Sequence, residues 1–164
     1  MLTIAKIDRF DTVNNPLDGT PAVTIWFSGC NFRCKNCHNR KLWNKNSGTT
    51  YSARLVASVI KATCTKVNAK SVVFLGGEPL QQNRDGLLYL CKELKDAGIK
   101  IWLYTGYDFD CVEMMFKDIL PMIYTIKCGK YNDKLKQDGF PASSNQKIYR
   151  TQDNKWVDIT AEFR

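Results

Sequence analysis

Three closely spaced cysteines, Cys30, Cys34 and Cys37, are the residues of this sequence best suited to chemistry. They directly follow an apolar run that ends at Ser28 and Gly29. Thiolates are ligands that soft metal centres prefer, and an irregular loop can turn three of them inward where a helix or a strand could not. An iron–sulfur cluster usually takes four cysteine ligands. Three cysteines would therefore leave one iron open to a ligand that is not protein.

Two other metal sites share part of this spacing. Structural zinc takes thiolate and imidazole ligands, and His38 could be its fourth ligand. However, His38 is adjacent to Cys37, and adjacent residues rarely reach one metal from a tight loop. The segment from Cys34 to His38 also matches the C-x-x-C-H pattern of haem attachment, which would leave Cys30 without a role. We favour an iron–sulfur cluster and keep a basic metal-binding module as the non-enzymatic alternative.

The length of 164 residues is most simply that of one domain with a real hydrophobic core. The fractions of hydrophobic (44%) and charged (24%) residues are ordinary for a globular protein. The N-terminal stretch MLTIAKIDRFD meets charge too early for a signal peptide, and no apolar run approaches the length of a membrane span. We therefore expect a cytoplasmic protein without membrane contact and without disulfide bonds.

The formal net charge of +8 invites a nucleic-acid interpretation. The lysines are spread along the chain, with a local concentration at residues 127–136, and no basic run alternates with aromatic residues as in a stacking platform for bases. We expect no direct role with nucleic acid. A solvated basic surface, or one that docks an acidic protein, fits the composition better.

Strand and helix patterns alternate after a lead-in formed by residues 1–21. Within that lead-in, the apolar alternation at 2–7 predicts an edge strand, and Asn14-Asn15-Pro16 predicts a turn. Residues 44–50 are typical of a polar link. The later patterns predict strands at 21–27, 71–75, 99–104 and 122–126, and helices at 52–65, 84–97 and 108–119.

Each predicted helix has its own signals. Ser52 is a suitable N-cap for the first helix, and Asp108 or Asp110 for the third. Gly98 is a suitable end for the second helix. The buried stripes that we expect are Leu55, Val56, Val59 and Ile60 on the first helix, and Leu87, Leu88, Cys91 and Leu94 on the second.

Strands that alternate with helices favour a parallel α/β sheet, whose strands all end at one rim. The cysteine loop, GGEP (76–79), YTGY (104–107) and KCGKY (127–131) each follow a predicted strand, so we expect them to meet there. A closed eight-stranded barrel takes about 250 residues. This chain therefore predicts a partial, open (β/α) barrel with its core at 22–127 and a C-terminal loop with short strands at 128–164. The lateral opening would suit a macromolecular substrate.

Gly76, Gly77 and Glu78 have a possible binding role at this rim. Glycines let a ligand approach the backbone closely, and the carbonyl groups that they expose can accept hydrogen bonds from a bound ammonium group. Glu78 would add negative charge for the same ligand. Taken alone, the segment is more typical of a tight strand-to-helix turn that ends at Pro79. Beside an open iron, we favour the binding role.

The combination of C-x3-C-x2-C with Gly-Gly-Glu-Pro resembles the radical S-adenosylmethionine (SAM) superfamily. Within it, the chain is similar to the small activating proteins of anaerobic (class III) ribonucleotide reductases. The stretches that carry the resemblance lie between Val23 and Tyr149, and YTGY and the late Ser-x-Asn-Gln narrow it to this family. They are SGCNFRCKNCHNRKLW, GGEPL, IWLYTGY and SSNQKIY.

The resemblance implies two cofactors, a [4Fe–4S] cluster and SAM. Cys30, Cys34 and Cys37 would hold the cluster and thereby serve catalysis, and the amino and carboxylate groups of SAM would chelate the fourth iron. The remaining positions that match the family's cofactor contacts are Asn36, Cys37 and His38 for the adenosine portion, Gly76, Gly77 and Glu78 for the amino group, Thr105 and Gly106 at the next strand end, and Asn145 in the late motif.

The resemblance also implies the reaction and the partners. An electron delivered to the cluster would cleave SAM, and the resulting radical would remove hydrogen from a glycine in the large subunit of an anaerobic ribonucleotide reductase. Such chemistry needs no general acid or base, in agreement with a single histidine in the chain. A flavodoxin-like protein would supply the electron. An activase of another glycyl-radical enzyme, of the pyruvate formate-lyase type, is the nearest alternative.

Three positions depart from the family pattern. Asn36 stands before the third cysteine, where many members of the superfamily have an aromatic residue. Pro141-Ala142 replaces the Arg-Gly that usually precedes the late motif. Cys128 stands where relatives commonly have aspartate, as a thiol at the rim or as a tolerated replacement.

Overall fold

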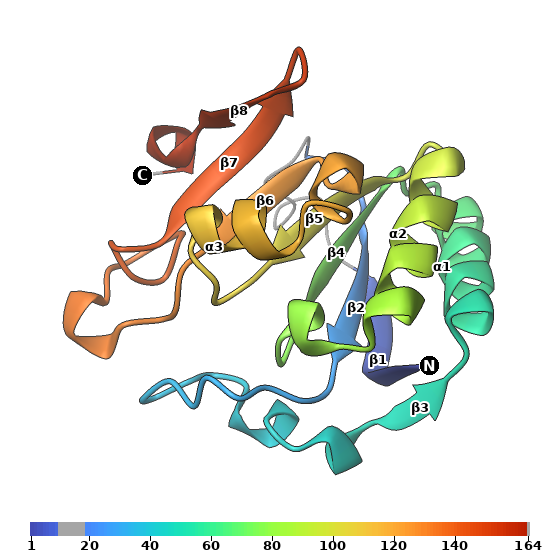
Figure 1. Ribbon diagram of the computed structural model, residues 1–164, viewed down its shortest axis with the longest axis horizontal. Helices are drawn as coiled ribbons and strands as arrows, with labels where there is room; N and C mark the ends of the chain where they lie inside the picture. Colours follow the sequence, from blue (N-terminus) through green and yellow to red (C-terminus); the bar gives the residue numbers. More distant parts are fainter. Residues whose placement is uncertain (10–18, 164) are drawn as a thin grey trace.

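One eight-stranded mixed sheet organises the protein, as the computed structural model of residues 1–9 and 19–163 shows (Figure 1). The strand order across the sheet is β3-β1-β2-β4-β5-β6-β7-β8. The strands are β1 (Leu2–Arg9), β2 (Val23–Phe27), β3 (Thr49–Tyr51), β4 (Ser71–Gly76), β5 (Lys100–Tyr104), β6 (Thr125–Cys128), β7 (Lys147–Gln152) and β8 (Lys155–Asp158).

Three α-helices alternate with the central strands. They are α1 (Ala53–Val67), α2 (Arg84–Asp96) and α3 (Phe109–Met115). Short 3-10 turns occupy Arg40–Leu42, Lys45–Ser47, Pro79–Gln81, Leu120–Met122, Asp133–Leu135 and Thr160–Phe163. No helix in the described ranges is both long and apolar enough to cross a membrane.

The four central strands, β2, β4, β5 and β6, run parallel and lie side by side in chain order. β1 and β3 extend the sheet antiparallel beyond β2, and β7 and β8 do so beyond β6. The predicted mixed α/β architecture with a parallel core is therefore confirmed. The pairing is that of an open sheet that begins at β3 and ends at β8.

The structure corrects the prediction of an edge strand at residues 2–7. β1 is an inner strand, because Thr49–Tyr51 pairs with its outer side. These three residues fall largely in the predicted polar link, and all three are exposed. A strand without a buried face carries no apolar alternation, so the sequence pattern could not reveal it. The predicted turn at Asn14-Asn15-Pro16 lies outside the described residues.

The predicted buried stripe on α1 is half wrong. The Ser52 hydroxyl caps the helix as expected, accepting a hydrogen bond from the Leu55 amide at 3.2 Å. Leu55 (49% exposed) and Val59 (39%) nevertheless face outward. The buried face consists of Val56, Ala57, Ile60 and Cys64. Two neighbouring faces of α1 carry apolar residues at helical spacing. The face that includes the smaller side chains of Ala57 and Cys64 is the buried one.

The second and third helices differ from expectation in smaller ways. On α2, Leu87, Cys91 and Leu94 are buried as predicted, but Leu90 takes the remaining core position and Leu88 is only half-buried. α3 ends at Met115 instead of reaching residue 119. A 3-10 turn at Leu120–Met122, which contains Pro121, follows, and the last parallel strand begins only at Thr125.

Both faces of the sheet are covered. The larger apolar core lies between the sheet and the three helices, where Phe27 and Phe74 meet edge to face with ring centroids 5.3 Å apart. A second cluster covers the other face around the fully buried Trp102. Phe140 and Phe163 from the C-terminal segment pack onto it. With both faces covered, the carboxyl ends of the central strands are left as the place for a site.

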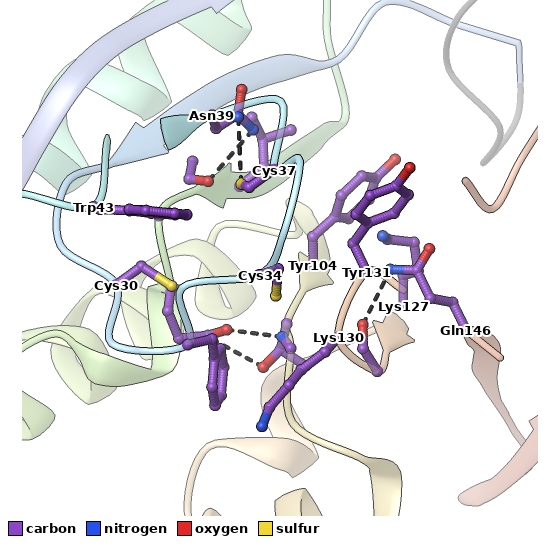
Figure 2. Close-up of a pocket in the computed structure, with 18 residues that line it drawn as sticks. Cys30, Cys34, Cys37, Asn39, Trp43, Tyr104, Lys127, Lys130, Tyr131 and Gln146 are labelled. Carbon is purple, nitrogen blue, oxygen red and sulfur yellow. Dashed lines mark hydrogen bonds between the residues drawn. The ribbon is translucent and has the colours of Figure 1, made fainter. Parts of the chain in front are cut away.

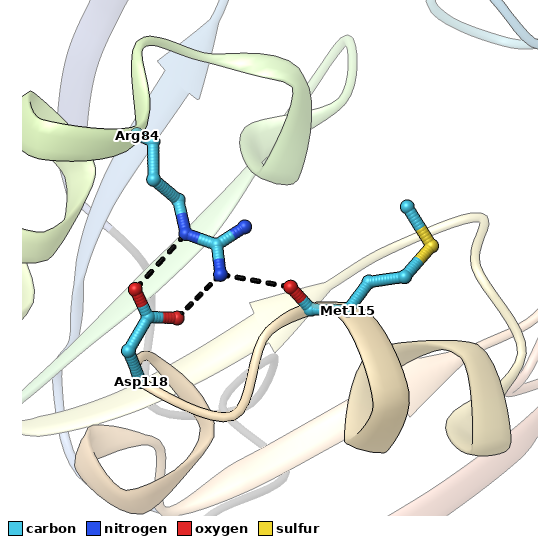
Figure 3. Close-up of polar contacts among 3 residues, drawn as sticks. All are labelled: Arg84, Met115 and Asp118. Carbon is cyan, nitrogen blue, oxygen red and sulfur yellow. Dashed lines mark hydrogen bonds and ion pairs between the residues drawn. The ribbon is translucent and has the colours of Figure 1, made fainter.

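Arg84 links the start of α2 to the chain that follows α3 (Figure 3). Its guanidinium group donates two hydrogen bonds to Asp118, at 3.1 and 2.6 Å, and one to the Met115 carbonyl at 2.8 Å. It also lies over the Phe116 ring, 4.7 Å from the ring centroid. The Met115 carbonyl is one of the C-terminal groups that the short helix α3 cannot satisfy itself. Arg84 therefore holds together two connections on the helical side of the sheet.

We predict that Arg84→Ala lowers the free energy of unfolding by about 1 kcal/mol, because the forked contact is lost. The loss should be no larger, since the contact is partly exposed and screened by water. Arg84→Lys should lose most of the same stability, since an ammonium group cannot replace the fork. Denaturant unfolding measures both. Lys61→Ala, which breaks the single-contact ion pair of Lys61 with Glu93, is the matched control with a smaller expected loss. An Arg84→Ala variant as stable as wild type would contradict the prediction.

Candidate active site

The ends of all four parallel strands surround one cavity of about 160 Å³ (Figure 2). The predicted convergence of the motifs at the strand ends is therefore observed. The lining residues are Cys30, Phe32, Cys34, Cys37, Asn39 and Trp43 from the segment after β2, Leu75, Gly76, Gly77 and Glu78 from β4, Tyr104, Thr105 and Gly106 from β5, and Lys127, Gly129, Lys130, Tyr131 and Gln146 from β6 and beyond.

The cysteine loop is irregular, as three inward-facing thiols require. Arg33 and Asn36 adopt left-handed backbone (φ 54° and 56°), which turns the chain sharply between the cysteines. The Cys37 amide donates to the Cys34 carbonyl at 3.2 Å, and the Cys37 sulfur accepts from the Asn39 amide at 3.4 Å. The conformation of the loop is therefore held by its own backbone.

The donor set suits an iron–sulfur cluster. Cys30, Cys34 and Cys37 line the same cavity. Among the described residues, no three His, Cys, Asp or Glu side chains are already grouped as for a single ion. A cluster binds each cysteine through a different iron, so its thiolates stand apart and need not converge on one atom. Burial raises the pKa of the Cys30 and Cys34 thiols, and binding of a metal centre must displace those protons.

Close backbone contacts fix the cysteine loop against the end of β4. The Gly77 amide donates to the Phe27 carbonyl at 2.8 Å, and the Glu78 amide donates to the Gly29 carbonyl at 2.9 Å. A Cβ on Gly76 would collide with the Phe27 backbone, and a Cβ on Gly77 would lie 2.5 Å from the Gly29 carbonyl oxygen. Gly76 also has a φ of 118°, which only glycine adopts readily. Packing alone therefore requires both glycines.

Glu78 connects the ends of β4 and β5. It is almost completely buried. One carboxylate oxygen accepts from the Leu80 amide and the Thr105 hydroxyl, at 3.0 and 2.9 Å, and the other accepts from the Gly106 amide at 2.8 Å. Burial nevertheless raises the pKa of Glu78 to about 7, because the loss of water outweighs these hydrogen bonds. Glu78 thus orders the rim of the cavity, with Thr105 and Gly106 as its partners.

Phe32, between the first two cysteines, anchors the loop to the end of β5. A Cβ added to Gly106 would lie only 2.6 Å from two carbons of the Phe32 ring. This ring meets Tyr107 edge to face at 4.9 Å between centroids, and the Lys130 ammonium group lies 4.9 Å from its ring centroid. No local sequence pattern indicates this contact, because Phe32 and Gly106 are brought together by the parallel pairing of the strands that precede them.

Three of the residues implied by resemblance lie outside the cavity wall. Asn36 donates a side-chain hydrogen bond to Asp133 at 2.9 Å. His38 packs near Tyr131, with ring centroids 5.6 Å apart. The Asn145 amide group donates to the Lys130 carbonyl at 2.9 Å. All three contacts tie loops together around the mouth of the cavity.

Lys127 and Trp43 are wall residues to which the sequence analysis gave no individual role, although Lys127 belongs to the KCGKY stretch expected at the rim. Lys127 pairs in register with Tyr104, and its ammonium group lies 5.0 Å from the Tyr104 ring centroid. Burial lowers the pKa of Lys127 to about 8. Its place at a strand end could have revealed it, since every other such motif contributes to the site. Trp43 lies in the link after the cysteines and had no comparable signal.

The late Ser-x-Asn-Gln motif closes the last side of the site. The Gln146 amide group donates to the Gly129 carbonyl at 3.0 Å, and its oxygen accepts from the Ser143 amide at 3.2 Å. The Ser143 hydroxyl accepts from the Asn132 amide at 3.2 Å. These bonds join the end of β6 to the start of β7. Cys128 is buried beside them, so it is not an exposed rim thiol.

Residues 18–149 match the family model described as a 4Fe-4S single cluster domain. The chain is 30% identical over 145 residues to the anaerobic ribonucleoside-triphosphate reductase-activating protein of Escherichia coli strain K12, covering 85% of this chain and 92% of that protein. The protein of the same name from Enterobacteria phage T4 is 29% identical over 155 residues, covering 92% and 96%. This chain belongs to the family of anaerobic ribonucleoside-triphosphate reductase-activating proteins.

The fold agrees with a solved structure as well. The crystal structure of QueE from Escherichia coli is similar, with a TM-score of 0.53 and 21% sequence identity over 64% of this chain and 52% of that one. At this identity the likeness concerns the fold alone. The likeness supports the α/β fold of this reductase-activating family member, and the family model supports an iron–sulfur cluster.

We predict that Gly106→Ala destabilises the protein by roughly 1–3 kcal/mol, the usual cost of overpacking, because the new methyl group collides with Phe32. The displaced ring should move the cysteine loop, so the iron bound per chain after anaerobic reconstitution should fall. Phe32→Leu in the same chain should restore much of both, since it vacates the space. Unchanged stability and iron content in Gly106→Ala would show that the two residues are not in contact.

We also predict a pH dependence that Glu78 causes. Its pKa is raised in the folded protein, from an ordinary value of 4.5 to about 7, so the folded state holds that proton more tightly than the unfolded state. The stabilisation that the protonated Glu78 carboxyl contributes is fully present below about pH 4.5 and is lost as the pH rises to about 7. Between these limits, the free energy of unfolding of the cluster-free protein should therefore fall more steeply in wild type than in Glu78→Gln. Denaturant titrations at several pH values measure it, and parallel curves would refute it.

Proposed function

We propose that this protein is a radical SAM activase, built on a partial, open (β/α) barrel, that generates a glycyl radical on an anaerobic ribonucleotide reductase. When bound, the [4Fe–4S] cluster and SAM supply the chemistry: one electron cleaves SAM, and the radical produced removes hydrogen from a glycine of the reductase. The observation that carries the proposal is the meeting of three cysteines with the Gly76–Glu78 segment around one cavity, in a chain of this activating family.

The cluster ligands would be Cys30, Cys34 and Cys37, the three thiols of the cavity wall. With only three protein ligands, one iron is left for SAM. The amino group of SAM would meet the segment Gly76–Glu78, whose glycines bring the β4 backbone to the cavity wall. Thr105 and Gly106, fixed by Glu78, would contact the same cofactor.

The outer candidates would act at the edge of the cofactor. Asn36 and His38 lie on the cysteine loop and interact with Asp133 and Tyr131 across the mouth of the cavity. Their contacts would hold this loop over the adenosine portion, with backbone at Cys37 nearest to it. Asn145 would act in the same way from the other side, through the Lys130 carbonyl.

The residues of this chain would bind and orient and would exchange no protons with the substrate. Both carboxylate oxygens of Glu78 already accept hydrogen bonds, and the single histidine lies outside the cavity wall. Tyr104 and Tyr131 add apolar surface to the wall, which would keep water from a reactive radical. The large glycyl-radical subunit of the reductase would present its glycine at the open side of the site. A flavodoxin-like donor would supply the electron.

The test is an anaerobic assay for SAM cleavage. The protein is reconstituted with iron and sulfide, reduced with dithionite and given SAM, and 5′-deoxyadenosine is quantified. We expect product with wild type and only the background level with Cys34→Ala, because one cluster ligand is missing. Cys111→Ala is the matched control, since Cys111 lies on α3 outside the cavity wall and its loss should leave the yield unchanged.

The result also separates the reductase activase from its alternatives. No product from wild type, with zinc recovered on metal analysis, would overturn the activase proposal in favour of a metal-binding module. Product formation together with a glycyl radical signal on an anaerobic reductase, and none on pyruvate formate-lyase, would establish the partner class.

A further inference from the structure

The positive charge of the chain is concentrated in one segment. Residues 19–77 contain nine Lys and Arg residues and no Asp or Glu, in a chain whose formal net charge is +8. The remaining residues are therefore close to neutral as a group. The lysines are spread along the whole chain, but the acidic residues are not. The local excess of positive charge comes from the absence of Asp and Glu in this segment. The segment includes the whole cysteine loop.

Five of these cations surround the cysteine loop. They are Arg33, Lys35, Arg40, Lys41 and Lys45, and all five side chains are exposed. None of them makes an ion pair with another residue in the part of the chain that the structure describes. We name this surface the basic loop face. Neighbouring cations without acidic residues among them produce a positive field that attracts an acidic partner.

Trp43 is held by two arginines of the basic loop face. The Arg33 guanidinium carbon lies 5.0 Å from the Trp43 ring centroid, and that of Arg40 lies 5.1 Å from it. The Trp43 carbonyl also accepts a hydrogen bond from the Cys30 amide at 3.1 Å. The indole is thus fixed to two surface arginines and to the backbone of the first cysteine.

Trp43 and Cys30 contribute to two cavities at once. Both line the central cavity with the other cysteines, as Figure 2 shows. Both also line a second cavity of about 540 Å³, together with Arg33, Lys45 and Gln81. The second cavity opens on the basic loop face, so only one side chain and one cysteine stand between that face and the position of the cluster.

We propose that the basic loop face is the docking site of an acidic one-electron carrier protein, which delivers its electron to the cluster past Trp43 and Cys30. The proposal rests on the activase function proposed above. One electron leaves the reduced carrier and one arrives at the cluster, so no bond or proton transfer is required of this chain. The glycine of the reductase can then use the open side of the central cavity while the carrier uses the other.

Geometry favours a carrier protein over a nucleic acid. Electron transfer slows steeply with distance, so a carrier must bind close to the cluster, and this face is both close and charged. Interfaces between redox proteins are small and bind weakly, and a face of five cations and one indole is of this kind. A nucleic acid would instead require bases to stack on several aromatic side chains, and the face offers one, already covered by two arginines.

The first test measures binding without chemistry. Oxidised flavodoxin, an acidic flavoprotein, is titrated by calorimetry into the cluster-free and the reconstituted protein at low salt. Arg33→Gln/Arg40→Gln and Lys41→Gln/Lys45→Gln should each weaken binding roughly fivefold or more, and salt should weaken the wild-type complex. Arg54→Gln/Lys66→Gln removes the same charge from exposed positions on α1 and should leave binding nearly unchanged. The cations that pack on the Trp43 ring are Arg33 and Arg40, so the Lys pair tests charge with both arginines still in place.

The second test separates this proposal from the activase function. In the reconstituted variants, cluster reduction by dithionite should proceed as in wild type, while reduction by fully reduced flavodoxin should slow by the same factor as binding weakens. Equal effects from all three double variants, or none from the two at the face, would overturn the docking proposal. Tighter binding of a 20-nucleotide single strand than of flavodoxin would overturn it in favour of a nucleic acid. Failure of dithionite itself would instead count against the activase function.

Discussion

The site depends on one close approach between two backbones. The end of β4 lies directly against the end of β2 and the start of the cysteine loop, through the hydrogen bonds from the Gly77 and Glu78 amides. Neither Gly76 nor Gly77 has room for a side chain there. This contact fixes where the cysteine loop leaves the sheet, and therefore where Cys30 stands. The glycines serve packing first, and a bound ammonium group would use carbonyls that packing has already placed.

Glu78 extends the same constraint to the neighbouring strand. A buried carboxylate is costly unless its oxygens are satisfied, and here three donors from the β4 and β5 ends satisfy it. Phe32 then packs on Gly106, so the cysteine loop is attached to β4 by hydrogen bonds and to β5 by an aromatic ring. The iron–sulfur centre and SAM that we propose for this site would need residues held firmly in place, and these contacts would hold them.

The two sides of the cysteine loop have different characters. One side faces the cavity of the parallel strands, with its aromatic and glycine-rich wall. The other carries exposed cations and the indole of Trp43. The proposed activase would receive an electron and act on a large partner, and a loop with two distinct faces would allow both without competition for one surface.

The sequence by itself determined the α/β alternation, the parallel core and the cysteine, glycine and glutamate motifs of the rim, because strand ends and ligand types are local properties. It also predicted the Ser52 cap of α1 and several core positions of α1 and α2. The tertiary structure decided which strand lies at the edge, which of two stripes on α1 is buried, and which residues complete the wall. Thr49–Tyr51 has no buried face to leave a pattern. Trp43 and Phe32 join the site only through contacts between segments distant in the chain, and no local pattern encodes such contacts.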